Sequence, residues 1–203
     1  IEKKFNFPVI GLDEVGRGPL AGPVISCGCY FHTYTHIKNE LEYINDSKKL
    51  SVKKRYLAFK IINNLKKKNI LDYKLGIATV NEIDKFNILN ATKMSMIRVL
   101  EKFQLPNATL IIDGNFKLSY KNYQEHSIIQ GDQQSLSIAT ASIIAKIYRD
   151  RLMSILSNKF KEFNWEQNAG YGTKQHLKQI KIVGPTIHHR KSFEPIKSLI
   201  HNK

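Results

Sequence analysis

Two adjacent carboxylates followed by a glycine-flanked arginine are the part of this sequence best suited to chemistry. Asp13 and Glu14 end an apolar run, and Gly16, Arg17 and Gly18 follow after a single valine. Carboxylate oxygens are the ligands that hard divalent cations prefer. Glycines let the backbone of a ligand come close, and a guanidinium offers a planar set of donors suited to phosphate. The spacing predicts a metal site beside a phosphate-binding loop, and therefore phosphodiester chemistry.

Two further aspartates, Asp113 and Asp132, also follow runs that are expected to be strands. In open α/β sheets, ligands bind at the carboxyl ends of the strands, so parallel neighbours would bring these acids together with Asp13 and Glu14. Four carboxylates at one edge repel one another unless cations lie among them, and two divalent ions roughly 3.5–4 Å apart are a known arrangement for phosphodiester cleavage. The alternative is that each aspartate only ends a strand, which is the better interpretation of Asp113 taken alone before a glycine.

The elements that must position these residues can be read from the apolar patterns. A hairpin followed by strands that alternate with helices indicates an α/β sheet of mixed direction. Buried, small-residue character in the third helix indicates close packing against that sheet. The expected strands are 7–13, 24–31, 70–79, 109–113 and 126–130, and the expected helices begin at 51, 81, 135, 173 and near 195.

Composition narrows the class of protein. The chain has 203 residues, 42% of them hydrophobic, which fits one folded domain with a small appendage. Its net charge of +15 favours a polyanionic partner such as nucleic acid. The alternative source of that charge is a codon bias toward Lys, Asn and Ile, so only basic residues near the site carry functional weight.

The two cysteines and the absence of targeting signals indicate a compartment. Cys27 and Cys29 lie two apart in an apolar run without His or Cys partners, so they are interpreted as buried, reduced residues. No signal peptide or apolar run of about 20 residues is visible. A cytoplasmic protein that does not enter a membrane is expected.

Several blocks of the sequence, in order and over nearly its whole length, resemble the ribonuclease HII family, the type 2 ribonuclease H of bacteria. The blocks are Asp-Glu-Val-Gly-Arg-Gly-Pro-Leu-Ala-Gly-Pro (13–23), Asn-Asp-Ser-Lys-Lys-Leu-Ser (45–51), Asn-Ile-Leu-Asn-Ala-Thr (87–92), Ile-Asp-Gly-Asn (112–115), Gly-Asp (131–132) with Ala-Ser-Ile-Ile-Ala-Lys-Ile-Tyr-Arg-Asp (141–150), and His-His-Arg-Lys-Ser-Phe (188–193).

The resemblance implies a fold and an activity. The fold is a ribonuclease H-like, five-stranded mixed sheet flanked by helices, with a catalytic domain over 1–160 and a C-terminal helical extension over 161–203. The activity is Mn²⁺- or Mg²⁺-dependent cleavage of the RNA strand of RNA/DNA hybrids, and of duplex DNA on the 5′ side of single embedded ribonucleotides. Two ions are expected during catalysis, the products carry 3′-hydroxyl and 5′-phosphate ends, and a monomer is the default.

The resemblance also implies site residues. Asp13, Glu14, Asp113 and Asp132 match the four catalytic, metal-binding acids. The 2′-hydroxyl-reading loop matches Gly16, Arg17 and Gly18, and the tyrosine that stacks on the sugar matches Tyr171. Phosphate or backbone contacts are expected from the residues Ser47, Lys48, Lys49, Arg190 and Ser192.

Some positions remain open or depart from the family pattern. Lys146 is interpreted as able to approach the acids or a phosphate, and Arg149 as a partner of Asp150. His188 and His189 are interpreted as structural. The family often has lysine where this chain has Gln130, which weakens the case for a phosphate contact there, and Thr140 stands where alanine is common.

Rival functions fail on particular features. Integrases and resolvases of the same fold lack Gly-Arg-Gly directly after Asp-Glu, and ribonuclease HIII carries an additional N-terminal domain. A non-catalytic nucleic-acid-binding protein would not need all four acids. A small-molecule phosphatase would need neither the charge nor the Gly-Arg-Gly loop.

Overall fold

The computed structural model describes residues 1–5, 8–35, 37, 43–44, 51–121 and 123–201. The chain divides into two compact units. The sheet unit contains Ile1–Val15, Ser26–Gly76 and Met96–Ile147, and the C-terminal unit contains Gly16–Ile25, Ile77–Ser95 and Tyr148–Lys203. The C-terminal unit therefore holds the expected extension together with three earlier stretches, one of which begins at the glycine-flanked arginine.

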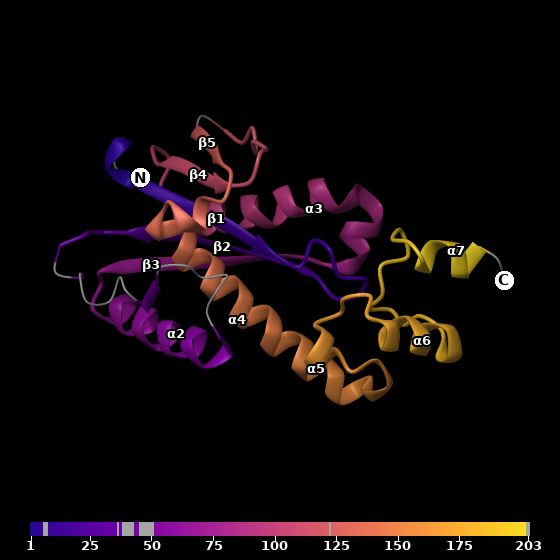
Figure 1. Ribbon diagram of the computed structural model, residues 1–203. Coiled ribbons are helices and arrows are strands. Elements are labelled where there is room, and N and C mark those ends of the chain that lie inside the picture. The colour runs from indigo at the N-terminus through magenta and orange to yellow at the C-terminus, as the bar shows by residue number, and fades with distance from the viewer. Residues whose placement is uncertain (6–7, 36, 38–42, 45–50, 122, 202–203) are drawn as a thin grey trace. The chain divides into compact units, whose positions relative to one another are not determined.

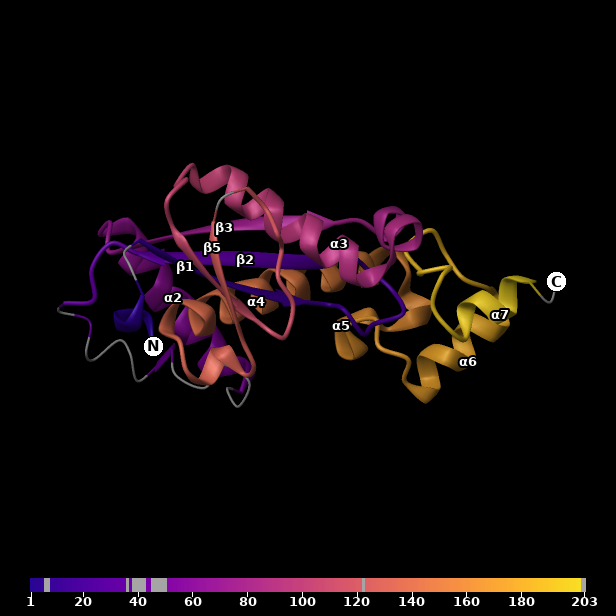
Figure 2. The same ribbon diagram turned by 90° about the horizontal axis from the view of Figure 1, so that it is seen from above.

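Five strands form one mixed sheet, as the sequence predicts. In spatial order they are β3 (Leu71–Ala78), β2 (Val24–Phe31), β1 (Val9–Val15), β4 (Thr109–Asp113) and β5 (Gln124–Ile128), which Figure 1 labels from bottom to top. Figure 2 shows the same strands from above. β4 is parallel to both β1 and β5. The edge strand β5 begins and ends two residues before its expected range of 126–130.

The helices follow the expected order. The longer ones are α2 (Val52–Lys67), α3 (Val80–Phe103), α4 (Leu136–Lys159) and α6 (Lys174–Val183), and the short helical segments are η1 (Glu2–Lys4), η3 (Gly131–Gln133), η4 (Lys161–Phe163), α5 (Trp165–Asn168) and α7 (Ile196–His201). Ser51 and Thr173 cap α2 and α6 by accepting from the amides of Lys54 and His176. α3 is interrupted at Asn87, whose φ of 67° is not helical and whose side chain accepts from the amide of Asn90. No helix of the described residues is both long enough and apolar enough to span a membrane.

Alternation along the strands of the sheet unit divides its core between two faces. Ile10, Leu12, Leu110 and Ile112 pack against the C-terminal half of α3. Val9 and Ile111 pack instead against Ile138 at the start of α4. Figure 1 shows α3 on one side of the sheet, and α2 with the beginning of α4 on the other. Cys27 and Cys29 are buried and free of disulfides, as expected from the sequence.

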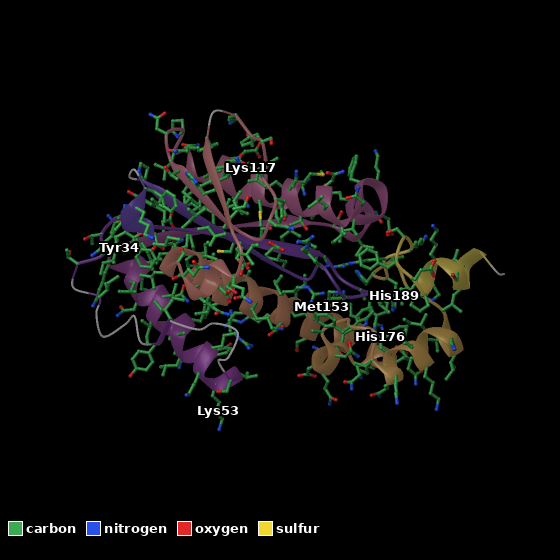
Figure 3. The ribbon with its side chains drawn as sticks, turned by 45° about the horizontal axis from the view of Figure 1, so that its top comes forward. Tyr34, Lys53, Lys117, Met153, His176 and His189 are labelled. Atoms are coloured by element: carbon green, nitrogen blue, oxygen red, sulfur yellow. The ribbon has the colours of Figure 1, made fainter. Side chains whose placement is uncertain are left out.

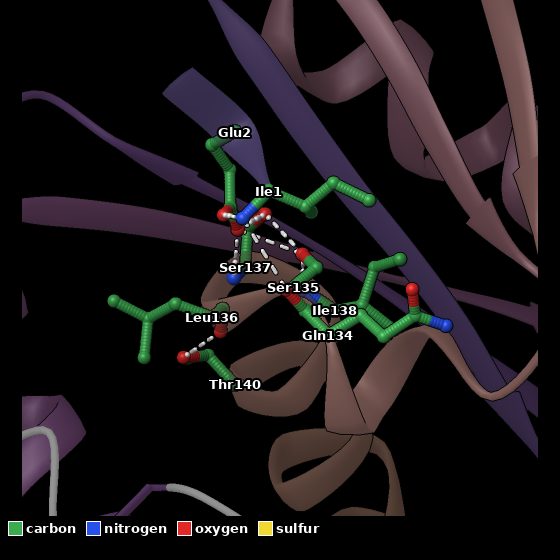
Figure 4. Close-up of polar contacts among 8 residues, drawn as sticks. All are labelled: Ile1, Glu2, Gln134, Ser135, Leu136, Ser137, Ile138 and Thr140. Carbon is green, nitrogen blue, oxygen red and sulfur yellow. Dashed lines mark hydrogen bonds and ion pairs between the residues drawn. The ribbon is translucent and has the colours of Figure 1, made fainter. Parts of the chain in front are cut away.

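A buried carboxylate holds the first turn of α4 (Figure 4). Glu2 accepts hydrogen bonds from the hydroxyls of Ser135 and Ser137 at 2.7 and 2.8 Å and from the Ser137 amide at 2.8 Å. Burial alone would raise the pKa of Glu2, but these hydrogen bonds outweigh it and lower the pKa. A negative charge here satisfies amides that have no partner within the helix and complements its dipole, so η1 fixes the start of α4.

The C-terminal unit has its own aromatic core. Trp165 is fully buried and stacks on Phe163 with 5.2 Å between ring centroids. Met153 of α4 and Ile180 of α6 complete the same cluster, so the unit buries an apolar interior without needing the sheet's residues.

Candidate active site

The parallel register places two acids side by side at the carboxyl ends of β1 and β4. Leu12 pairs with Ile112, so the next residues on each strand are Asp13 and Asp113. By alternation both point to the face that α4 covers. Gly11 allows α4 to lie this close to β1, because a Cβ there would overlap the backbone of Ser137 and Ile138 at the start of α4.

Asp132 comes from the turn after β5. It lies in η3, where it is 2% exposed, and the preceding amide of Gly131 donates to the Asp113 carboxylate at 2.7 Å. Gln130, the departure from the family pattern, adopts a left-handed conformation with φ 54° just before this turn. The hydrogen bond of Gly131 therefore connects the turn that carries Asp132 to Asp113. The sequence suggests that Asp132 lies at the end of a strand, but the structure places it in this turn.

Like charges crowd Asp13. Its carboxylate is 5% exposed. Burial, and then the neighbouring charges of Glu14 and Asp113, raise its pKa well above the usual value, although the side chain of Ser142 and the amide of Glu14 donate to it. A cation placed among these oxygens would relieve both the burial cost and the repulsion.

The donors at this edge fit a divalent cation in type. All are carboxylates, which suit Mg²⁺ or Mn²⁺ better than a soft metal. Within the part of the chain that the structure describes, no three His, Cys, Asp or Glu side chains converge into a ready-made metal shell. Mg²⁺ is commonly held by one or two carboxylates with water and substrate phosphate oxygens completing its octahedron, so paired acids suffice for this type of site.

The glycine-flanked loop, Gly16–Gly18, is held from behind by a buried arginine of the C-terminal unit. Arg190 is 0% exposed, and its guanidinium donates to the carbonyls of Gly16, Arg17 and Gly22. Burial lowers its pKa to about 9, so the group remains charged at neutral pH. Each of its three side-chain nitrogens donates to a carbonyl of this segment, which supports a role for Arg190 in positioning the loop. The phosphate contact that the sequence predicts for Arg190 stays a prediction.

A second buried arginine binds backbone carbonyls of the segment just after the loop. Arg149 of α4 is 0% exposed and donates to the carbonyls of Ala21, Pro23 and Ala169. Gly16 has a φ of 96°, and a Cβ there would overlap the Arg149 side chain. The sequence indicates Asp150 as the partner of Arg149. It did not predict that Arg149 binds these backbone carbonyls. The only signal of that binding was an arginine within an otherwise apolar or small helical stretch.

Tyr171 lies next to the same loop. Its ring is 47% exposed, and a Cβ on Gly18 would be 3.5 Å from it. Its carbonyl accepts from the amide of Thr173 at 2.8 Å, so the backbone around the ring is fixed. An exposed aromatic ring on a fixed backbone beside a glycine is suited to stacking on a sugar or base.

Of the other residues with a predicted substrate contact, the structure describes one and leaves three outside the described residues. The Ser192 hydroxyl donates to Asp84 at 2.6 Å, and the amides of Lys191 and Ser192 donate to the same carboxylate, so Ser192 is engaged in fixing its own loop. Ser47, Lys48 and Lys49 lie outside the described residues. Their predicted contact with the nucleic-acid backbone stays a prediction.

Comparison with known proteins agrees with this geometry. The family model described as Ribonuclease HII matches residues 10–195. A Ribonuclease HII of Wolbachia pipientis wMel is 47% identical over 97% of this chain and 94% of its own length. The solved ribonuclease H2 from Pyrococcus horikoshii OT3 has a TM-score of 0.75 at 25% identity and covers 97% of this chain and 98% of its own. Bst-RNase HIII, solved in complex with Mn²⁺, has a TM-score of 0.67 at 18% identity, covers 96% of this chain and 70% of its own, and is similar in fold alone.

Proposed function

The chain belongs to the ribonuclease HII family and is a type 2 ribonuclease H hydrolase acting on RNA/DNA hybrids, and we propose that it also nicks duplex DNA on the 5′ side of a single embedded ribonucleotide. Hydrolysis would leave a 3′-hydroxyl and a 5′-phosphate. We further propose that one copy of the chain is sufficient, which sedimentation or light scattering would test.

The observation that carries the proposal is the parallel register of β1 and β4, which brings Asp13 next to Asp113 at the ends of the two strands. Burial and neighbouring acids make the ionised form of Asp13 costly, and such a site is stable at neutral pH when a cation accompanies it. A carboxylate cluster of this kind, in a chain with a net charge of +15, suits a polyanionic substrate.

In the proposed mechanism Asp13 and Asp113 would hold one Mn²⁺ or Mg²⁺ ion, and Glu14 and Asp132 would complete the site for a second. Bound ions of this kind supply activation of the attacking water and stabilisation of charge on the leaving 3′-oxygen. The Asp113 carboxylate accepts from the Gly131 amide at 2.7 Å, which orients it at the end of β4.

Selectivity for a ribonucleotide would come from the loop Gly16–Gly18 and Tyr171. A site that distinguishes RNA from DNA at one position must read the 2′-hydroxyl. Arg190 binds the carbonyls of Gly16 and Arg17, and Arg149 binds those of Ala21 and Pro23 in the segment just after the loop. These bonds from the buried side support a preformed loop. Arg17 would supply a phosphate or hydroxyl contact, and Tyr171 would stack on the sugar that follows.

A labelled DNA duplex with one ribonucleotide tests the proposal. Wild-type protein with Mn²⁺ or Mg²⁺ is expected to give a single nick 5′ of the ribonucleotide and to leave an all-DNA duplex intact. Asp13→Asn is expected to bind the same duplex and not to cut it.

The opposite results would separate the alternatives. Binding without cleavage by the wild type under either metal would indicate a nucleic-acid-binding protein on this fold. Cleavage of the all-DNA duplex at a similar rate would overturn the role of the loop in reading the 2′-hydroxyl.

A further inference from the structure

Two buried histidines lie in contact in the C-terminal unit (Figure 3). The Nε2 atoms of His176 and His189 are 3.1 Å apart, and both residues are 0% exposed. The indole of Trp165 donates to His176 Nε2 at 3.0 Å. The proposed mechanism uses neither imidazole, so the contact needs another explanation.

Neighbouring groups determine the proton position on His176. Its Nδ1 lies 2.8 Å from the carbonyl oxygen of Tyr171, which can only accept. Nδ1 must therefore carry the proton. Its Nε2 faces the indole N–H of Trp165, which can only donate, so Nε2 must be unprotonated.

The same reasoning determines His189. Its Nδ1 accepts from the backbone amide of Thr186 at 2.9 Å, so Nδ1 is unprotonated. A neutral ring then carries its proton on Nε2 and donates it to His176 Nε2. One arrangement of protons is thus compatible with every contact, with the single lone pair of His176 Nε2 shared between the indole N–H and the His189 Nε2–H. Adding a proton to either ring would place two donors face to face.

The charged surroundings also favour neutral rings. Burial lowers the pKa of His176. Burial and then the neighbouring His176 and His188 lower the pKa of His189 to about 3. His188 in turn lies near Lys159, and Arg190 follows His189 directly. Within the described residues, no acidic side chain is among the causes of either shift.

The pair connects two parts of the proposed substrate site. His176 binds the backbone of Tyr171, and His189 is bonded to His176 and precedes Arg190, which holds the loop Gly16–Gly18. The bridge between Ala21 and His189 adds a second connection, to the segment that follows that loop. We infer that His176 and His189 form a neutral pair with fixed tautomers, and that both are positioning residues which hold Tyr171 and the loop for ribonucleotide recognition. This role rests on the proposed function.

Nitrogen-15 NMR of the histidine side chains tests the pair without any activity. The expected spectrum shows His176 protonated on Nδ1 and His189 on Nε2, with His189 not titrating between pH 8 and pH 5 and with the pKa of His176 below the ordinary histidine value. The opposite tautomers, or titration of either ring near pH 6.5, would overturn the inference. This result does not depend on whether the protein cleaves any substrate.

Two substitutions at His176 separate the contacts. His176→Asn retains a donor near the position of Nδ1 and can still bind the Tyr171 carbonyl. His176→Gln retains an acceptor near Nε2 and can still bind Trp165. Because Trp165 is the only tryptophan, its indole N–H signal reports directly which variant keeps that bond.

If His176 positions Tyr171, the two variants must differ in KM. His176→Gln is expected to raise KM for the single-ribonucleotide duplex about tenfold with a smaller change in kcat, and His176→Asn is expected to raise it less than threefold. His188→Gln is the control for loss of a neighbouring imidazole. Equal KM values for the Asn and Gln variants, with the expected tautomers, would overturn the positioning role and leave a structural pair. If wild type does not cut the duplex, the proposed function fails while the tautomer result stands.

Discussion

At the scale of single residues, the crowding around Asp13 has a consequence for stability as well as for chemistry. A carboxylate whose pKa is raised on folding makes the folded state less stable at neutral pH than below the folded pKa. Metal-free protein should therefore lose stability as pH rises through the folded pKa of Asp13. A bound cation reverses this penalty.

Asp13→Asn should accordingly raise the melting temperature of metal-free protein at pH 7.5, by about 2–4 °C for a gain of ~1 kcal/mol. Adding Mn²⁺ should stabilise wild type by mass action and the variant less. Thermal denaturation with EDTA or with Mn²⁺ measures both effects. Asp72→Asn is the matched control, because Lys66 and Lys74 pair with Asp72 at 2.7 and 2.9 Å and its loss should destabilise. An Asp13→Asn protein that is less stable than wild type in EDTA would contradict the crowding argument.

The positive φ of Gly16 gives a second test at this scale. Gly16→Ala should cost both backbone strain and the overlap with Arg149, about 2–4 kcal/mol in all. Gly184→Ala separates the two costs, because Gly184 also has a positive φ of 82° but nothing lies within 4 Å of an added Cβ. Denaturant unfolding should show the larger loss for Gly16→Ala, and duplex cleavage should lose its selectivity for the ribonucleotide only in that variant. Equal losses of stability would show that Arg149 does not restrict this position.

At the scale of elements, the start of α4 matters because the helix begins just after Asp132 and packs against β1. Glu2 supplies the charge for its first turn, and Ser135 caps it by accepting from the Ile138 amide at 3.1 Å. The close approach to Gly11 depends on that turn staying in place.

Glu2→Gln should lower the free energy of unfolding by about 1–3 kcal/mol, because a charged acceptor of several hydrogen bonds is lost from a buried position. The pKa of Glu2 is lowered on folding, so its contribution is present above pH 4.5 and is lost as pH falls through the folded pKa. Urea unfolding at pH 7 and pH 3 measures this difference. Glu162→Gln, at an exposed glutamate, should have little effect at either pH. An equal loss for Glu2→Gln at both pH values would contradict an ionised cap.

At the scale of the whole molecule, the net charge of +15 should dominate substrate affinity. Release of counterions makes the logarithm of affinity fall linearly with the logarithm of salt concentration, with a slope of about −0.9 for each phosphate neutralised. Fluorescence anisotropy of Asp13→Asn with a ribonucleotide-containing duplex from 50 to 200 mM KCl should give a slope steeper than about −3. The all-DNA duplex should give the same slope with weaker affinity. A flat dependence would show that the basic residues are not arranged along the bound duplex.

Much of the architecture could be predicted from local patterns. Strand residues 24–31 and 109–113 were predicted with their observed bounds, because apolar runs flanked by turn residues are local signals. The break at Asn87 was missed, because a helical pattern continues on both sides of it. The predicted range of β5 was two residues too late, because an edge strand without a buried residue has no apolar run to mark its ends.

The sequence by itself determined the chemical inventory, the family resemblance and the order of elements, because residue types and their spacing are local properties. Only the tertiary structure decided which groups meet. Parallel pairing of β1 with β4 put Asp13 beside Asp113. The folded chain also put the guanidinium groups of Arg149 and Arg190 against backbone carbonyls, and it joined His176 to His189 across thirteen residues. Such roles depend on which carbonyls and ring nitrogens lie within hydrogen-bonding distance, and sequence spacing does not encode that distance.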